Sequence, residues 1–511
     1  MLIGRNGWTN EADADPIRDP RSSSGLRHRM ALLLGVVVVV VYTPSSNNSS
    51  TTMRRCCLLL SLLLSCLASS TAALNRRRSL LAVRGGGLSL KKKKAPAVTK
   101  KPTSPKPTTG GSATIPNEVF NLVKAIVGVG VLGLPAGIAA FGNAPSAVFP
   151  AIALIALIGI LSGYGFATIG RVCALTQATS YREAWSQSVG SGTAWIPAWS
   201  TTLKTFLACL AFSMVLGDTF ASLLGTVRTP TLLGVTVGVL LPLCWLKNLS
   251  SLAPFSLLGV VGMAYTALAM TVRYLDGSYS VPNGPLAMQV AEHLRPSFGS
   301  RGWQSVASPQ ALLLVSMLST AYMAHFNAPK FYLELQNNTM PRYYTVVAWS
   351  FGISILLMGG MAGLGFLTFG GACRGLVLEH YASSDAWMAL SKAAVAVSLV
   401  FSYPLAFQGC RDGVLDLCKI KPTNAVLNGT TIALLGVLTT LAILLKDVSF
   451  VLAISGATLG NLLTYVYPAI MLHCAVKDRS KARGSLTESY VSAVLGVVMG
   501  IVGAKLALDK L

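Results

Sequence analysis

Eleven long apolar runs follow one another between residues 117 and 508, and no other feature of the sequence restricts the fold as strongly. Each run is close to, or longer than, the ~20 residues that an α-helix needs to cross the hydrocarbon core of a bilayer. Because backbone polar groups have no water to bond inside lipid, each run must form its own hydrogen bonds, which predicts helices rather than strands. We therefore predict an all-α membrane protein with about eleven transmembrane helices. The predicted spans are residues 117–141, 144–171, 196–225, 230–246, 252–274, 309–335, 343–369, 385–409, 425–445, 448–475 and 486–508.

The composition agrees with a lipid environment. Charged residues make up 12% of the 511 residues, whereas soluble domains carry about 25%. The formal net charge is +23, but 18 of the 41 lysines and arginines lie in the first 110 residues. Positive charge beside membrane spans sets their orientation, so we assign the excess to the membrane surface rather than to nucleic acid. The ten cysteines have no metal-type spacing, and we expect no metal site.

The N-terminal part of the chain is predicted to be separate from the spans. Residues 1–52 are interpreted as an extension, because Met53 is a possible alternative start. Residues 53–74 have the basic start, apolar stretch and small-residue end of a signal peptide or signal anchor. Residues 75–116 are predicted to be a basic, disordered linker. With this linker in the cytoplasm, the odd-numbered helices of the membrane domain 117–508 run outward. A cleaved signal peptide would place the linker outside, and both interpretations stay open.

The first span contains Gly128, Gly130, Gly133 and Pro135 within eight residues. These residues are poor helix formers, and a helix break in a membrane survives where its freed backbone groups face protein or a polar cavity. Half-helices at such a break offer N–H and C=O groups to a substrate and an ion. Close helix packing through small residues is the alternative explanation. The proline that ends the glycine pattern favours a binding break.

A second break is predicted in the sixth span, between Ser319 and His325. Polar side chains, including Tyr322 and Asn327, cluster there beside Pro329. The first and sixth spans each begin a set of five, and matching breaks are typical of an inverted repeat with a binding site at the midplane. A buried histidine can also be a hydrogen-bonded packing residue. We therefore expect His325→Ala to change substrate affinity or selectivity, or else to reveal a packing role.

The motif from Asn121 to Pro135 and the sixth-span ending Tyr332–Leu335 resemble the amino acid/auxin permease family. The resemblance covers about residues 112–508 and includes the eleven spans. It implies a LeuT-type fold, with a five-plus-five inverted repeat and one more helix, and amino acid transport by alternating access. The resemblance also implies a substrate site: Gly128, Val129, Gly130, Val131 and Gly133 for the carboxylate, and Ser319, Tyr322 and His325 for the amino group and side chain.

Lys124 stands in the first span where sodium-coupled relatives carry an asparagine, which is a departure from the family pattern. An ammonium inside a membrane is costly and indicates a function; Lys124 could fill the space of sodium and exchange a coupling proton. We therefore expect coupling to protons, or exchange, rather than to sodium, with Lys124→Ala removing the pH dependence. Two alternatives stay open: Lys124 could snorkel to the interface, and Ser398 or Ser402 of the eighth span could bind sodium. Lys204 and Asp218 of the third span are further candidates for a proton path.

The predicted function is a secondary carrier of amino acids, and neutral amino acids are the expected substrates. The spans contain no nucleophile–base pair, metal cluster or phosphate-binding loop, which argues against an enzyme and a primary pump. A carrier of another small organic solute and an amino acid sensor without turnover remain alternatives, and uptake and binding assays separate them. We expect a small-molecule substrate and the lipid bilayer as partners, no cofactor, and a multi-pass location in a vacuolar, endomembrane or plasma membrane.

Overall fold

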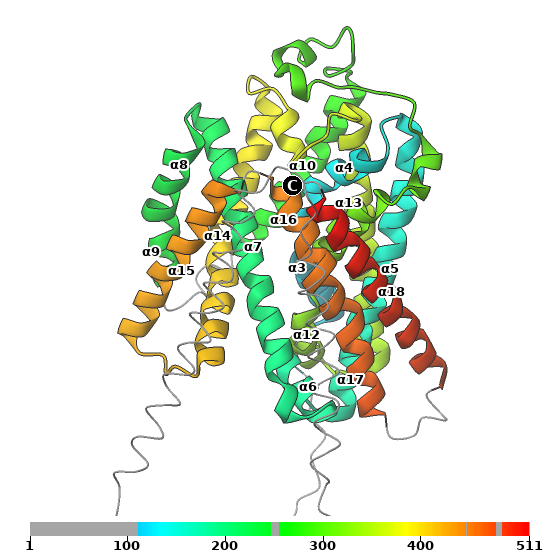
Figure 1. The fold of residues 1–511 in the computed structure, drawn as a ribbon, viewed down its shortest axis with the longest axis vertical. Coiled ribbons are helices and arrows are strands. Elements are labelled where there is room, and N and C mark those ends of the chain that lie inside the picture. Colours follow the sequence, from blue (N-terminus) through cyan, green and yellow to red (C-terminus); the bar gives the residue numbers. More distant parts are fainter. Residues whose placement is uncertain (1–110, 247–254, 446, 477–482, 510–511) are drawn as a thin grey trace, which may run out of the picture. The chain divides into compact units, whose positions relative to one another are not determined.

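The computed structural model describes residues 111–246, 255–445, 447–476 and 483–509, and Figure 1 shows their fold. The β pairing within these residues amounts to two isolated bridges, Ala113 with Leu335 and Ser297 with Gly370. The all-α class is thus confirmed. The predictions for the extension, the signal segment and most of the basic linker concern residues outside the described ranges.

Each of the eleven predicted spans contains a helix. Nine helical stretches of the described residues are long and apolar enough to cross a membrane, and α3 with α4 forms a tenth, bent by 54°. Helix α10 occupies the remaining predicted span, the fifth. In span order the helices are α3 (Ile115–Ile126) with α4 (Gly130–Phe141), α5 (Val148–Thr176), α7 (Trp195–Leu224), α8 (Arg228–Val235) with α9 (Leu241–Trp245), α10 (Phe255–Leu275), α11 (Ala311–Ala321) with α12 (Ala328–Glu334), α13 (Met340–Phe369), α14 (Ala386–Cys418), α15 (Asn424–Leu444), α16 (Val448–Ser455) with α17 (Tyr467–Ala475), and α18 (Arg483–Leu508).

The helices pack in pairs that are five spans apart. Helix α4 of the first span packs on α11 of the sixth, α5 of the second on α13 of the seventh, and α7 of the third on α14 of the eighth. Helix α9 of the fourth span likewise packs on α15 of the ninth (Figure 1). A five-plus-five repeat has corresponding helices at this separation, so this pairing agrees with the repeat expected from the two breaks.

The loops that follow odd-numbered spans meet at one end of the helices. The Arg301 N–H, between α10 and α11, donates to the Asn143 side chain, which follows α4. Ser297 pairs with Gly370, which follows α13. At the opposite end of the helices, the backbone N–H of Gly111 donates to Leu333 O at the end of α12. The short helix α6 (Tyr181–Ser188), which follows α5, packs on α17 at this same end. The chain therefore crosses in alternating directions, as the spans predict.

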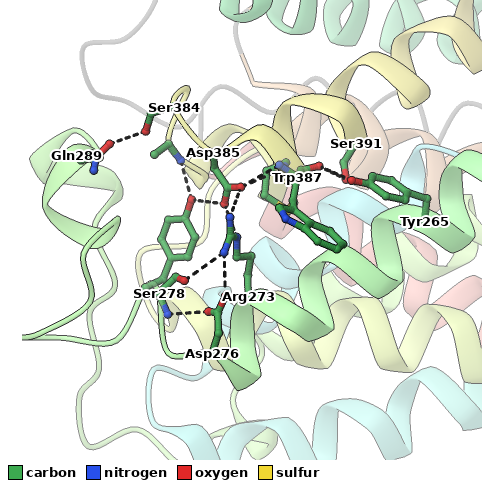
Figure 2. A network of polar contacts seen from close by, with 12 residues as sticks. Tyr265, Arg273, Asp276, Ser278, Gln289, Ser384, Asp385, Trp387 and Ser391 are labelled. Carbon is green, nitrogen blue, oxygen red and sulfur yellow. Dashed lines mark hydrogen bonds and ion pairs between the residues drawn. The ribbon is translucent and has the colours of Figure 1, made fainter.

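An ion-pair network ties the loop after α10 to the start of α14 (Figure 2). The Arg273 guanidinium donates through Nε and one terminal nitrogen to both carboxylate oxygens of Asp385, each at 2.8 Å. Asp385 is fully buried, and it also accepts from the Tyr279 hydroxyl. It caps the start of α14 by accepting from the backbone N–H of Trp387. The other terminal nitrogen of Arg273 donates to the Asp276 carboxylate at 2.8 Å. Because every oxygen of the buried carboxylate has donors, the network can hold a charge away from water.

Candidate functional site

The first break lies between α3 and α4. Helix α3 ends at Ile126, where Val127 adopts an extended conformation, and α4 begins at Gly130. The interruption is therefore shorter than the predicted stretch from Gly128 to Pro135, because Gly133 and Pro135 are inside α4. Pro135 is tolerated there as the sixth residue of the helix, where it removes one backbone hydrogen bond without ending the helix.

Backbone N–H groups are left free at this break. The Val131 and Leu132 N–H groups donate to Gly128 O and Val129 O, at 3.1 and 3.0 Å. For the N–H groups of Gly128, Val129 and Gly130, the described part of the chain provides no backbone acceptor. These groups lie at the N-terminus of α4, where the helix dipole favours negative charge. The break is therefore suited chemically to a carboxylate.

The second break directly faces the first. Helix α11 ends at Ala321, residues 322–324 are not helical, and α12 begins at Ala328. A Cβ added at Gly130 would lie 3.5 Å from the Cα of Ala321. At Gly133 it would lie 3.2 Å from the end of the Met317 side chain on α11. Two interruptions almost 200 residues apart in the chain are thus brought into contact.

The predicted side chains of the sixth-span break are already bonded within the protein. The Tyr322 hydroxyl donates to Ile155 O on α5 at 3.1 Å. The His325 ring Nε2 lies 2.8 Å from Ser162 O, also on α5, and His325 is fully buried. The Ser319 hydroxyl donates to Val315 O of its own helix. This geometry supports the role of holding the break open, and substrate contact by these three side chains stays a prediction.

Sequence reasoning missed the partners of His325. Thr464, in the π-helical segment Leu462–Val466 between α16 and α17, lies 3.4 Å from the His325 Nδ1. The neighbouring Tyr465 hydroxyl shares a 3.0 Å hydrogen bond with the Ser162 hydroxyl. In the sequence, Thr464 and Tyr465 are only polar residues in the middle of an apolar run. The same pattern fits a hydroxyl that bonds its own helix backbone, so it does not identify them as partners of His325.

We expect His325→Phe to destabilise the protein more than it changes substrate recognition. The substitution keeps an aromatic ring but removes the 2.8 Å hydrogen bond from the ring Nε2 to the buried Ser162 carbonyl, at a cost of about 0.5–1.5 kcal/mol. Thermal unfolding in detergent and the KM for uptake measure the two effects. His293→Phe, in the exposed loop after α10, is the control. An altered order of preferred substrates with unchanged stability would instead assign His325 to substrate contact.

The three residues predicted for the coupling ion are not joined by any contact that the structure records. Lys124 is half-buried in the last turn of α3, and among the described residues it has no ion-pair partner. A cation there is favoured by the negative end of the helix dipole. Ser398 lies on the side of α14 that faces α10, and its hydroxyl is the atom nearest to a Cβ built at Gly259. Helix α14 packs chiefly on α7 and α10. An ion site shared by Lys124 with Ser398 or Ser402 therefore remains a prediction.

The two candidates in the third span differ in their surroundings. Asp218 forms an ion pair with Arg228, at the start of α8. Arg228 also donates to the carbonyl oxygen of Ala442 at 2.9 Å. Lys204 is buried, and the hydrogen bond recorded for its ammonium goes to the Ser455 hydroxyl on α16, at 3.4 Å. Asp218 is thus neutralised by a cation, whereas no anion among the described residues pairs with Lys204.

The loop between α13 and α14 covers the first break on one side. Gly375 O lies 3.8 Å from the Cβ position of Gly133, and the Ser449 hydroxyl at the start of α16 donates to the same oxygen. Glu379 lies in the 3-10 turn Val377–His380 of this loop. Burial raises the pKa of Glu379 to about 7, and the negative charge of Asp218 adds to the shift. The Glu379 carboxyl in this loop therefore gains or loses its proton near neutral pH.

An all-helical membrane bundle with paired breaks and counterpart helices five spans apart has the LeuT-type fold. The solved structure titled "Inward facing conformation of Mhp1" has a TM-score of 0.51 to this chain at 12% identity, covering 82% of this chain and 95% of that one. The family model described as "Transmembrane amino acid transporter protein" matches residues 111–508. The chain belongs to this family.

Curated relatives agree with the family. Sodium-coupled neutral amino acid transporter 7 of Danio rerio is 22% identical, over 79% of this chain and 87% of its own length. Amino acid transporter AVT6E of Arabidopsis thaliana is 23% identical, over 75% and 81%. Solute carrier family 38 member 8 of Homo sapiens is 24% identical, over 73% and 88%. Membership in this family confirms a multi-pass membrane protein that is a transporter rather than an enzyme.

Proposed function

We propose that this protein is a secondary active transporter that moves neutral amino acids across a membrane by alternating access. The observation that carries the proposal is the contact between the two breaks at Gly130 and Ala321. The N-terminus of α4 offers free N–H groups to a carboxylate, and the C-terminal end of α11 offers carbonyl oxygens to an ammonium group. An amino acid has both groups on one carbon, so the facing half-helices suit its backbone and leave the side chain for selectivity.

The unequal access to the two sides of the first break supports alternation. On the side of the α13–α14 loop, Gly375 and Ser449 close over Gly133. Toward α3, Gly128 is exposed, and a Cβ added there would meet no atom within 4 Å. A site that is covered on one side and accessible on the other is what one half of an alternating-access cycle requires.

We propose further that transport is driven by protons or by exchange rather than by sodium. The support is Lys124, a cation in the last turn of α3 beside the first break, because two cations do not share a desolvated site cheaply. Some relatives have names that describe them as sodium-coupled. A measurement of the driving ion therefore tests whether this protein differs from them.

Replacing sodium by choline is expected to leave uptake intact. The protein in proteoliposomes is supplied with an equimolar mixture of tritiated neutral L-amino acids, with sodium and proton gradients imposed separately. Accumulation with a proton gradient in choline, or counterflow without any gradient, is the expected result. A steep sodium requirement overturns the coupling proposal, and saturable binding without uptake under every condition overturns transport.

A further inference from the structure

Lys204 places an ammonium group deep inside the helix bundle. It is the tenth residue of the 30-residue helix α7, roughly 14 Å along the axis at 1.5 Å per residue. Its exposed fraction is 7%. At this depth the side chain does not reach the membrane surface, so snorkelling does not account for it.

The neighbours of Lys204 do not neutralise its charge. No carboxylate among the described residues acts on the ammonium, and its recorded partner is the Ser455 hydroxyl at 3.4 Å. Along α7, Ser200 bonds the Tyr467 hydroxyl on α17, and Cys209 is a buried thiol. On α14, Gly409 and Gly413 lie against Thr205 and Thr202, the α7 residues on either side of Lys204, and Cys410 is a buried thiol. Arg411, between these two glycines, bonds Cys244 O and the Thr431 hydroxyl and pairs with Asp412, and no charged group among the described residues is recorded on the Lys204 ammonium.

Lys392 shows how the same fold treats another buried lysine. It is 4% exposed, and its ammonium donates to the Ser222 hydroxyl and to Tyr381 O, at 3.2 and 3.3 Å. The carboxylates of Glu379 and Asp385 are near enough to favour its charge. Lys392 is thus compensated, whereas Lys204 is an unpaired charge inside the membrane, which is costly and indicates a function.

A chain of contacts through α16 and α11 leads from Lys204 to the two breaks. Ser455 ends α16, and the next residue, Gly456, packs so closely on α11 that an added Cβ would overlap Ser316 O. The Thr320 hydroxyl on α11 donates to Leu452 O on α16 at 2.7 Å. Ala321, which follows Thr320, is the residue that faces Gly130. A change at the Lys204–Ser455 contact therefore acts on the helix end that forms the second break.

We propose that Lys204 is the residue that binds and releases the coupling proton, an inference that rests on the proton-driven form of the proposed function. The step is the reversible protonation of the amine: the neutral amine takes up one proton to become an ammonium and later returns it, with no change in other bonds. An ammonium can only donate to Ser455, whereas the neutral amine can accept from the Ser455 hydroxyl. The charge state of Lys204 thus sets the hydrogen bond that holds α7 to α16.

Under this assignment Lys124 is a fixed cation beside the first break, and Lys204, not Lys124, carries the proton. The test compares Lys204→Met, which removes the charge, and Lys204→Arg, which keeps it permanently, with Lys505→Met, at an exposed lysine in the last turn of α18. Each full-length protein is reconstituted in proteoliposomes with the tritiated amino acid mixture. Two readouts are taken: counterflow exchange at symmetric pH, and accumulation driven by a one-unit pH gradient.

The parent is expected to accumulate amino acid up to roughly tenfold, the ratio that one pH unit supports with one proton per substrate. Both Lys204 variants are expected to keep exchange but to reach only equal concentrations inside and outside, and their exchange rates are expected not to vary between pH 5.5 and 8. Lys505→Met is expected to keep the accumulation that the gradient drives.

Accumulation by Lys204→Met equal to that of the parent overturns the inference and leaves proton-driven transport standing. Loss of both exchange and accumulation in both Lys204 variants also overturns it, because that pattern marks a packing residue. If the parent protein accumulates amino acid with a sodium gradient but not with a pH gradient, proton coupling itself is overturned. Measurements on the parent protein alone distinguish this outcome from a failure of the Lys204 assignment.

Discussion

Replacing Gly130 by leucine is expected to abolish uptake while the protein stays folded and inserted in the membrane. The Cβ of any side chain at this position lies 3.5 Å from Ala321, an ordinary contact distance, so the backbone of the break has room for it. The rest of a leucine side chain then has to fill the space between the two breaks, where the substrate carboxylate is proposed to bind. We expect uptake to fall by more than about 100-fold, which corresponds to roughly 2.8 kcal/mol or more.

The matched control is the same substitution at Gly436, on α15. This glycine is exposed and has no atom within 4 Å of its Cβ position, so leucine there only adds apolar surface to an apolar helix. Equal amounts of both variants at the membrane and equal melting temperatures establish that folding is intact. Normal uptake by a correctly inserted Gly130→Leu protein would show that the substrate binds elsewhere.

Replacing Arg273 by methionine is expected to lower the free energy of unfolding by about 3–5 kcal/mol, because it leaves a buried carboxylate without its cation. The carboxylate is that of Asp385, which is fully buried and receives two Arg273 hydrogen bonds at 2.8 Å (Figure 2). The loop that contains Tyr279 is held to α14 through the same carboxylate. Thermal unfolding in detergent, and protease cleavage of the loop after α10, measure the loss.

Arg182→Met provides the comparison for this ion pair. Arg182 pairs with Asp416, but the two side chains are 51% and 53% exposed. Water screens such a pair, and its removal is expected to change stability by less than about 1 kcal/mol. Equal destabilisation by the two substitutions would mean that the Arg273 network contributes no more than a surface ion pair.

The eleven spans and the two breaks were predictable because their causes are local. A span needs only enough consecutive apolar residues to cross lipid. The breaks need only residues that weaken a helix, and Gly128, Gly130 and Pro329 do so wherever they occur. The exact extent of the first break was less predictable, because Pro135 lies inside α4, where its ring packs against Gly365 of α13.

The roles of particular polar residues depended on partners that are distant in the chain. His325 and Tyr322 have the composition of a binding site, but α5 supplies the carbonyl oxygens that occupy both side chains. Lys204 and Lys392 are both lysines within apolar helices, and only the fold gives one of them acidic neighbours and leaves the other with a single serine.

The sequence by itself thus determined the membrane class, the number of spans and the position of the breaks, because hydrophobic length and glycine or proline content act within one segment. Only the tertiary structure decided which buried polar group is already satisfied and which is free to act. That distinction depends on hydrogen bonds and charges from helices far apart in the chain, such as the contact of Lys204 with Ser455. Local sequence patterns do not specify such pairings, because the partners come together only when the helices pack.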